Sequence, residues 1–399
     1  MQNKGSEDHS ILTVNGRIEL SRRRYSVPGA DSCHPLDSWV DRVTDTISLG
    51  VREMASRLNL GSRNFDTAAD NLARTAQVRV SGETLRQIVE SEGKAVERAA
   101  KAGTLPVNWN AKDCQALDKD EQPTQKTRIY LGSDGVMVPL VTDVEKQTRR
   151  TRIKVKRQRL GRRLRPLRRR KPGADQSYKE FKIVTFYDDV CEHRLVSVTR
   201  GDCEQAGRLM RRDAGRVGLD KADDKVGVVD GSEWIKNQIR RQNLPLDDLG
   251  LDFYHLSENM HKARRAVFGE EDPKDQTAPG NVWVSELLHA AKHGGYPALH
   301  ERLAEWKKGL CPAKQDAAER LMNYVEDRRE MILYPKFLEQ GRQIGSGPTE
   351  SMCKATTQRI KGVGMRWDAD NAESIMALAA LDQSGNWQHY WQGRLAHNN

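Results

Sequence analysis

Apolar and polar positions alternate differently along three stretches of the chain. Residues 11–14 and 17–20 are short apolar runs on either side of Asn15-Gly16, the strongest two-residue signal for a β-hairpin. Residues 38–101 repeat their apolar positions at helical spacing, which predicts helices over 65–76 and 83–99 with N-caps at Asn64 and Ser81. The chain therefore begins with a predicted hairpin followed by a helical region.

Beyond residue 120, strand-like and helix-like segments alternate. The predicted strands cover 128–133, 181–187, 194–199, 226–229 and 251–255, and the predicted helices cover 203–216 and 232–242. Two of these strands stop at an acid followed by glycine, at Asp134-Gly135 and Asp230-Gly231. Alternating strands and helices are typical of a mixed α/β sheet, so both aspartates are expected at the ends of core strands.

A third acid lies in a different setting. Gly345-Ser346-Gly347-Pro348-Thr349-Glu350 is expected to open a helix, with proline near the first turn and Glu350 just inside it. Before this segment, helical periodicity extends over 281–293, 297–308 and 314–331. The glutamate is thus separated from the second aspartate by a predicted all-helical insertion.

Asp134, Asp230 and Glu350 together indicate metal-dependent phosphoryl transfer. Mg²⁺ prefers oxygen ligands, and two ions about 3.5–4 Å apart can hold the attacking and leaving oxygens of an in-line displacement. Each motif alone has a simpler explanation, because Asp-Gly is a common turn and an acid in a first helical turn complements the helix dipole. The hypothesis rests on the three acids together.

Five segments resemble, in order, the signature blocks of ISKra-type bacterial insertion-sequence transposases. They are Ser133-Asp134-Gly135-Val136-Met137-Val138-Pro139, Val229-Asp230-Gly231-Ser232-Glu233-Trp234-Ile235, Leu251-Asp252-Phe253-Tyr254-His255-Leu256-Ser257-Glu258, Gly345-Ser346-Gly347-Pro348-Thr349-Glu350 and Arg359-Ile360-Lys361-Gly362-Val363-Gly364-Met365-Arg366-Trp367. The resemblance covers roughly residues 11–390. It implies a DDE transposase with an RNase H-like catalytic domain and with Asp134, Asp230 and Glu350 as its triad.

The same resemblance implies the reaction and the partners. The enzyme would use two Mg²⁺ ions, with Mn²⁺ tolerated, to cut element ends and join the freed 3′-hydroxyl to target DNA. Asp134 and Asp230 would share both ions, and Glu350 would complete the second ion's coordination. A homodimer or higher multimer is expected, because two DNA ends must be held together.

Three further residues are candidates for auxiliary roles. Asp252 and His255 resemble the acid-or-cysteine, two-residue, histidine motif of Mutator-related transposases, and His255 is expected to position a phosphate or relay a proton. The alternative is a partly buried structural histidine. Lys354 lies one helical turn after Glu350 and is a candidate phosphate contact, with a surface ion pair as the alternative.

Positive charge is concentrated in one tract, residues 146–171, which holds fifteen Lys or Arg and no acid, whereas the whole chain has a net charge of +10. We predict a loop that orders on DNA, with RNA as a second possible partner, while a solvated insertion is the alternative. The candidate DNA contacts, including two beyond Glu350, are Arg149, Arg150, Arg152, Lys154, Lys156, Arg157, Arg162, Arg163, Arg168, Arg169, Arg170, Arg359 and Lys361.

Two other features have a DNA-binding interpretation and an equally simple structural one. The helices over 65–76 and 83–99 are a candidate helix-turn-helix that offers Arg86 and Gln87 to a major groove, or else a supporting helical hairpin. Trp283 and Trp306 are candidates for stacking on a DNA base, or else packing side chains.

Composition sets broad limits on the class of protein. With 399 residues, 37% of them apolar, the chain can form two or three domains. There is no apolar run of about 18 residues and no apolar signal core at the N-terminus, so we expect a cytoplasmic, nucleoid-associated protein without a membrane partner. None of the six cysteines forms a CxxC pair. Neither a zinc ribbon nor a disulfide framework is therefore supported. The chain differs here from the family it resembles, whose members often carry a CxxC pair in the segment matching residues 24–33.

The predicted fold is α/β, with an RNase H-like mixed sheet and a helical insertion behind a mostly helical N-terminal DNA-binding region that carries a β-hairpin. The expected domains are 1–37 (hairpin), 38–120 (helical), 125–255 (first part of the catalytic core), 256–343 (all-α insertion) and 344–399 (completion of the core). Alternative functions are an RNase H-like nuclease or resolvase without joining activity, a non-enzymatic DNA-binding regulator, and a structural basic protein.

Overall fold

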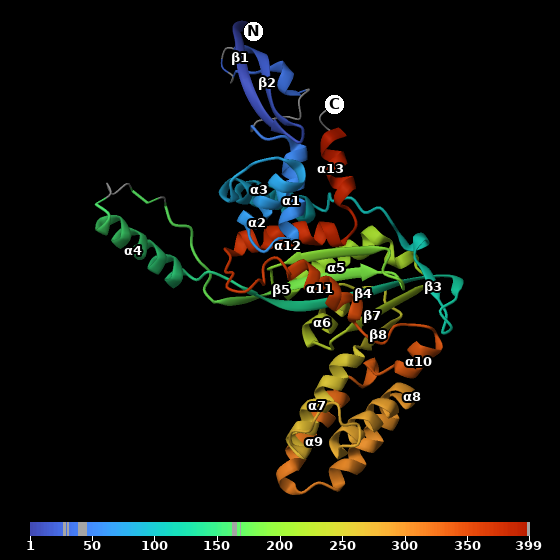
Figure 1. Cartoon of the computed structure of the whole chain (residues 1–399). Coiled ribbons are helices and arrows are strands. Elements are labelled where there is room, and N and C mark those ends of the chain that lie inside the picture. The colour runs from blue at the N-terminus through green and yellow to red at the C-terminus, as the bar shows by residue number, and fades with distance from the viewer. Residues whose placement is uncertain (27–28, 30–31, 39–45, 162–165, 168, 397–399) are drawn as a thin grey trace. The chain divides into compact units, whose positions relative to one another are not determined.

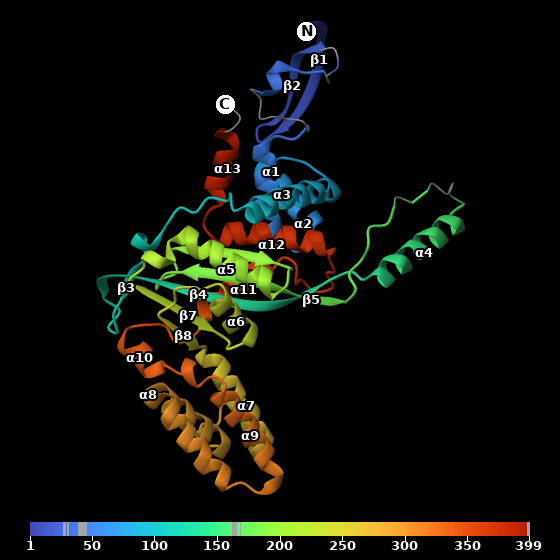
Figure 2. The ribbon, with the colours of Figure 1, turned by 180° about the vertical axis from the view of Figure 1, so that it is seen from behind.

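The computed structural model describes residues 1–26, 29, 32–38, 46–161, 166–167 and 169–396 (Figures 1 and 2). The chain forms two compact units. We call Val107–Gly135 with Lys182–Cys353 the sheet unit, and Met1–Pro106 with Val136–Phe181 and Lys354–Asn399 the terminal unit.

A six-stranded sheet forms the centre of the sheet unit. Its order is β6-β5-β4-β7-β8, with β3 paired to β4. The strands are β3 (Gln115–Leu117), β4 (Pro123–Pro139), β5 (Tyr178–Tyr187), β6 (Arg194–Thr199), β7 (Asp224–Val229) and β8 (Asp248–Leu251). β5 and β6 are antiparallel, whereas β4, β7 and β8 run parallel. The predicted mixed α/β class is confirmed, and the RNase H-like type stays a prediction.

Apolar side chains of the sheet are buried against two helices, α5 (Cys203–Val217) and α6 (Glu233–Arg241). Ile129, Phe186 and Val229 from the strands share one core with Met210 of α5 and Ile235 of α6. Short 3₁₀ turns, η2 (Ala111–Asp113) and η3 (Leu219–Lys221), connect these elements. This core holds the parallel strands in place at the ends that carry the predicted acids.

The predicted helical insertion is a bundle of α7 (Phe253–Phe268), α8 (Pro279–Lys308) and α9 (Pro312–Glu326), followed by η4 (Arg329–Met331) and α10 (Tyr334–Glu339) (Figure 1). The two helices expected over 281–293 and 297–308 are the two halves of α8, which are separated by a kink at the non-helical Gly295, where φ is 68°. Proline at 297 favours such a kink.

In the terminal unit, the predicted hairpin consists of β1 (Gln2–Thr13) and β2 (Gly16–Ser26), which is followed by η1 (Pro35–Ser38). The helices α1 (Leu49–Leu60), α2 (Phe65–Ala76) and α3 (Gly82–Ala102) pack with α12 (Ala369–Gln383), and α13 (Trp387–Ala396) follows. The two N-caps are confirmed, because the side chains of Asn64 and Ser81 accept hydrogen bonds from Thr67 N and Thr84 N.

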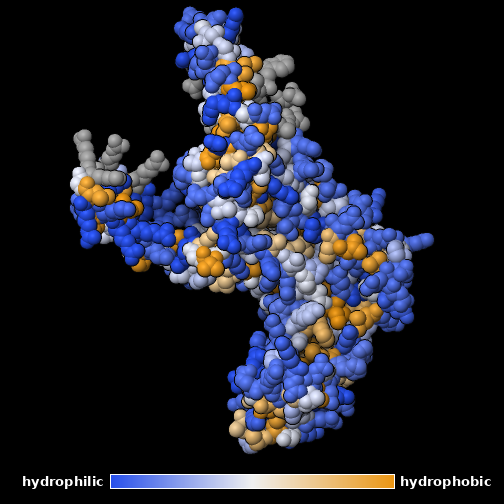
Figure 3. Space-filling view, in the orientation of Figure 1, coloured by the Kyte–Doolittle hydropathy of each residue, from blue (hydrophilic) through white to orange (hydrophobic). Residues whose placement is uncertain are grey.

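The first half of the basic tract is a helix, which corrects the predicted loop. Helix α4 (Asp143–Arg159) begins with a capping box between Thr142 and Glu145, and Lys and Arg are good helix formers. It buries none of its residues. Figure 3 shows mainly hydrophilic side chains over it, interrupted by apolar ones. Arg162, Arg163 and Arg168 lie outside the described residues.

Two predicted absences can be compared with the structure over the residues it describes. None of the six cysteines, all of which lie in the described part of the chain, forms a disulfide, and Cys114 and Cys353 are buried. No described helix combines the length and the apolar character needed to span a bilayer.

Candidate metal centre

Asp134 and Asp230 belong to neighbouring parallel strands. The register of β4 and β7 pairs Arg128 with Asp224 and continues to Leu131 opposite Gly227. Extended by three residues beyond the observed pairs, this offset would bring Asp134 opposite Asp230, and the charge of Asp230 does raise the pKa of Asp134. Because neighbouring strands lie about 4.8 Å apart, the two carboxylates share one end of the sheet.

The position of Asp134 within its strand differs from the prediction. β4 does not stop at this acid but continues to Pro139, because Val136 and Val138 remain buried and extend the strand alternation. Asp134 is half-buried, and its carboxylate accepts a hydrogen bond from Gly135 N at 2.7 Å. Burial raises the pKa of Asp134, and the negative charges of Asp230 and Glu350 raise it further. The three predicted acids therefore lie within electrostatic reach of one another.

Asp230 follows β7 directly, as predicted. Its carboxylate accepts hydrogen bonds from Ser232 N at 2.8 Å and from the Ser232 hydroxyl at 2.5 Å. Gly231 between them has φ of 78°, and a Cβ there would lie 2.6 Å from Arg328 Nε. This tight turn orients the carboxylate at the end of the strand.

Asp252 and His255 are in a helix, which corrects the predicted strand over 251–255. β8 ends at Leu251, and Asp252 is the N-cap of α7, with His255 in its first turn. Asp252 is fully buried and accepts hydrogen bonds from Tyr254 N, His255 N and Ser346 N. Its Oδ2 also lies 2.5 Å from His255 Nδ1.

This pair has a defined charge state. Burial alone raises the pKa of Asp252, but the hydrogen bonds from His255 and Ser346 bring it below the ordinary value. The hydrogen bond to Asp252 raises the pKa of His255 to about 9, aided by the charges of Asp252 and Asp230. His255 is therefore a cation near neutral pH, directly beside the predicted acids.

Glu350 lies in α11 (Gly347–Thr357), one residue after the buried Thr349. One ligand atom from each of Asp252, His255 and Glu350 falls within 4.8 Å of the others. Among the described residues, the predicted acids Asp134, Asp230 and Glu350 do not form so compact a group. A pair of ions about 3.5–4 Å apart needs a wider spread of ligands than a single ion does.

The donors present suit a hard divalent cation. Asp134, Asp230 and Glu350 offer carboxylate oxygens only, the ligand type that Mg²⁺ and Mn²⁺ take. The mutual repulsion that raises the pKa of Asp134 is what a bound cation relieves. Asp252 differs from these acids, because it is fully buried and forms an ion pair with His255.

Gly132 and Thr349 position the glutamate and were missed by sequence analysis. A Cβ on Gly132 would lie 1.8 Å from Thr349 Oγ1 and 2.7 Å from Thr185 Oγ1. The two threonine hydroxyls are 3.1 Å apart and hydrogen-bonded. The absence of a side chain in β4 thus allows α11 to approach the sheet. A glycine inside an apolar strand is the available signal, since it often marks close backbone approach.

The other predicted site residues differ in whether their polar groups already have partners and in how exposed their side chains are. Arg86 forms ion pairs with Glu83 and Glu90, and Gln87 donates to Glu83, so their polar groups are already engaged within α3. Lys354 and Lys361 are exposed. Arg359 is only 4% exposed.

The tryptophans and the basic residues can also be placed. The rings of Trp283 and Trp306 are 4.2 Å apart and both contact Phe268, which supports packing over base stacking. Arg170 is paired with Asp143. The remaining basic-tract candidates within the described residues lie on α4 or just beyond it, and they are Arg149, Arg150, Arg152, Lys154, Lys156, Arg157 and Arg169.

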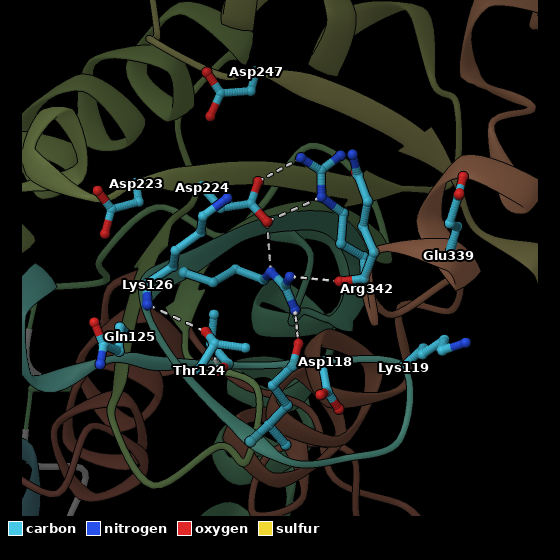
Figure 4. A pocket seen from close by; sticks show the side chains of 14 residues that line it. Asp118, Lys119, Thr124, Gln125, Lys126, Asp223, Asp224, Asp247, Glu339 and Arg342 are labelled. Carbon is cyan, nitrogen blue, oxygen red and sulfur yellow. Dashed lines mark hydrogen bonds and ion pairs between the residues drawn. The ribbon is translucent and has the colours of Figure 1, made fainter.

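Figure 4 shows a cavity of about 650 Å³ where β4 and β7 begin. Two buried arginines line it, and Asp224 binds both, with Arg128 Nε at 2.6 Å and Arg342 Nε at 3.0 Å. Arg128 also contacts Asp189, and Arg342 also contacts Asp248. Since these cations are neutralised by buried acids, the cavity is a structural network rather than a candidate ligand site.

Comparison with known proteins adds little at this point. No family model matches the chain, and no curated protein matches it. Among solved structures, the chain is similar to the Drosophila P element transposase strand transfer complex, with a TM-score of 0.27 and 10% sequence identity over 86% of this chain and 80% of that chain. A likeness this distant carries no argument about function, so the following proposal rests on the residues themselves.

Proposed function

We propose that this chain is a DNA transposase of the DDE type with an RNase H-like core. Asp134, Asp230 and Glu350 would hold two Mg²⁺ ions, or Mn²⁺ in their place. The observation that carries the proposal is the parallel pairing of β4, which carries Asp134, with β7, which leads into Asp230, together with the charges of Asp230 and Glu350 that raise the pKa of Asp134. The five motif blocks that contain these acids support the same function.

Bound divalent ions would supply Lewis-acid activation of the scissile phosphate and of the attacking oxygen. The chain's own residues hold and align the groups that react. The carboxylates of Asp134 and Asp230 are kept at the sheet end by hydrogen bonds from Gly135 and Ser232. Water exclusion and fixed geometry are the main contributions expected from such a site.

His255 is suited to placing a phosphate rather than to taking a proton. With a pKa of about 9 it carries a positive charge near neutral pH, and Asp252 fixes its ring through Nδ1. A cation held beside three acids can contact the phosphate oxygens that approach them. Lys354, exposed one turn after Glu350, is proposed as a second phosphate contact.

The proposed partners are element-end DNA and target DNA, and the active form is proposed to be a dimer or higher multimer in the cytoplasm, associated with the nucleoid. The exposed basic side chains of α4 and Lys361 would contact the DNA backbone. A nuclease or resolvase would use the same acids without a joining step, and RNA is the alternative substrate for such an enzyme.

The deciding experiment is a Mg²⁺-dependent cleavage and joining assay on DNA that carries the sequences flanking the coding region. Wild type is compared with Asp230→Asn and with Asp220→Asn, an exposed aspartate of η3, as the matched control. Joined product from wild type and the control, but not from Asp230→Asn, is expected. Cleavage without joining indicates a nuclease, and DNA binding without chemistry in any protein indicates a regulator.

A further inference from the structure

A second cavity, of about 440 Å³, lies within the terminal unit. Its walls come from the start of α2, one face of α3, the start of α4 and residues 359–371. Asn64, Phe65, Arg149, Arg359, Trp367 and Asn371 are among the residues that line it. Its size is within the range of small-ligand sites.

The guanidinium of Arg359 is held rigidly in the wall of this cavity. It lies 4.8 Å from the ring centroid of Phe65 and 5.1 Å from that of Trp367. Its Nε donates to Asn59 Oδ1 at 3.1 Å. The residue is 4% exposed, and no carboxylate forms an ion pair with it in the described part of the chain. Burial lowers the pKa of Arg359 to about 10.

The other cations of the cavity differ, because most of them have acidic partners. Lys146 pairs with Asp368, Arg366 pairs with Glu145, and Arg86 pairs with Glu90. Arg149 resembles Arg359 in this respect, since no ion pair with it occurs over the described ranges. Arg149 is nevertheless close enough to Glu145 to lower the pKa of that carboxyl, so among the described residues it is Arg359 for which no acidic partner is found.

A buried charge without a counter-charge is costly, and contacts with aromatic rings offset only part of the desolvation. In the sheet unit, the buried Arg128 and Arg342 are neutralised by Asp224, whereas no acid among the described residues plays this part for Arg359. An anion from outside the chain would supply the missing counter-charge. A planar guanidinium held against two aromatic rings is well suited to contact with phosphate.

We propose that this cavity binds a backbone phosphate of nucleic acid through Arg359 and Arg149. Helix α4 continues from the cavity, and Arg149, Arg152 and Lys156 follow at spacings of three and four residues on one helical face. A row of cations beside a fixed phosphate site matches a linear polyanion better than a single small anion. The inference rests on the proposed function for its partner, but binding tests it without catalysis.

The first measurement is thermal unfolding of the full chain, with EDTA present and inorganic phosphate added. Phosphate is expected to raise the Tm of wild type and of Arg79→Gln, whose arginine is exposed in the terminal unit and does not line the cavity. The shift is expected to vanish in Arg359→Gln and Arg149→Gln. Arg149 is exposed, so its variant still decides the question if Arg359→Gln fails to fold.

The second measurement is fluorescence anisotropy with a labelled DNA duplex at several salt concentrations, again in EDTA. Arg149→Gln is expected to weaken binding several-fold and to reduce the slope of log K against log salt by about 1. Inorganic phosphate should compete with the duplex. If phosphate shifts the Tm but does not compete with the duplex, the cavity binds a small anion and the nucleic-acid proposal is overturned. Unchanged DNA binding in both Arg359→Gln and Arg149→Gln also overturns it. DNA binding that depends on Arg149, in a protein that cuts nothing, contradicts the proposed catalysis and leaves this inference standing.

Discussion

Asp252 is fully buried and paired with His255, so we expect this acid to act on the site through the residues it holds. It orders Ser346 ahead of the glutamate helix, caps α7 and keeps His255 charged. One buried side chain thereby connects the strand end, the helical insertion and α11. The sequence showed the Asp-x-x-His spacing, but a strand was predicted there, because Leu251, Phe253 and Leu256 also suit a short apolar strand.

The charge on His255 predicts a pH-dependent contribution to stability. Its pKa is about 9 in the folded protein and about 6.5 when unfolded, so the stabilisation is fully present below pH 6.5 and is lost as the pH rises through 9. The side chain is 34% exposed, so screening limits the contribution to about 1 kcal/mol. Urea unfolding at pH 6, 7.5 and 9.5 should show the difference between wild type and His255→Gln shrinking with pH. A difference that stays constant across this range contradicts the charged pair.

At the scale of elements, local signals placed most helices and strands. The bounds of α2 and β6 agree with their predicted ranges, because a good N-cap marks the start of α2 and a short run of buried residues marks β6. Errors occurred at β4 and α4. At β4, the Asp-Gly pair predicted a turn, but the strand continues because the residues that follow remain buried. At α4, the repulsion of like charges was overestimated against helix propensity and a strong cap.

Because α11 lies so close to β4, adding one methyl group at Gly132 is expected to lower both stability and activity. Gly132→Ala is expected to destabilise the fold by about 1–3 kcal/mol and to lower cleavage about tenfold or more, because Cβ would meet the Thr349 hydroxyl. Combining it with Thr349→Ala, which removes that hydroxyl, should restore part of the activity. Gly347→Ala is the matched control, since nothing lies within 4 Å of its added methyl group. Equal effects of Gly132→Ala and Gly347→Ala on cleavage rates and urea unfolding would refute this role.

At the scale of the whole molecule, segments far apart in sequence are joined by buried charges. Asp224 forms ion pairs with Arg128 and Arg342, and Asp248 forms ion pairs with Arg342 and Lys336. These pairs connect the starts of β4, β7 and β8 with the segment that precedes α11. They help to hold in register the strands whose other ends carry Asp134 and Asp230.

Removing the central acid of this network is expected to be severe. Asp224→Ala would leave two buried arginines short of a counter-charge and cost about 3–5 kcal/mol. Its neighbour Asp223 is exposed, and Asp223→Ala should destabilise the fold far less. Urea unfolding of the two variants at pH 7 measures the contrast. A loss of less than 1 kcal/mol in Asp224→Ala shows that the network contributes little.

The sequence alone was sufficient for the hairpin, the caps, most helices and strands, and the three acids as one hypothesis, because these depend on periodicity and on residues within a few positions. The tertiary structure decided the rest. Four features depend on partners that are distant in the chain or whose orientation follows from packing. They are the register of β4 against β7, the approach of α11 to Gly132, the contact of the Arg359 guanidinium with two aromatic rings, and the raised pKa of His255. Pattern along the chain cannot encode such contacts, since pairing and burial are set by the fold as a whole.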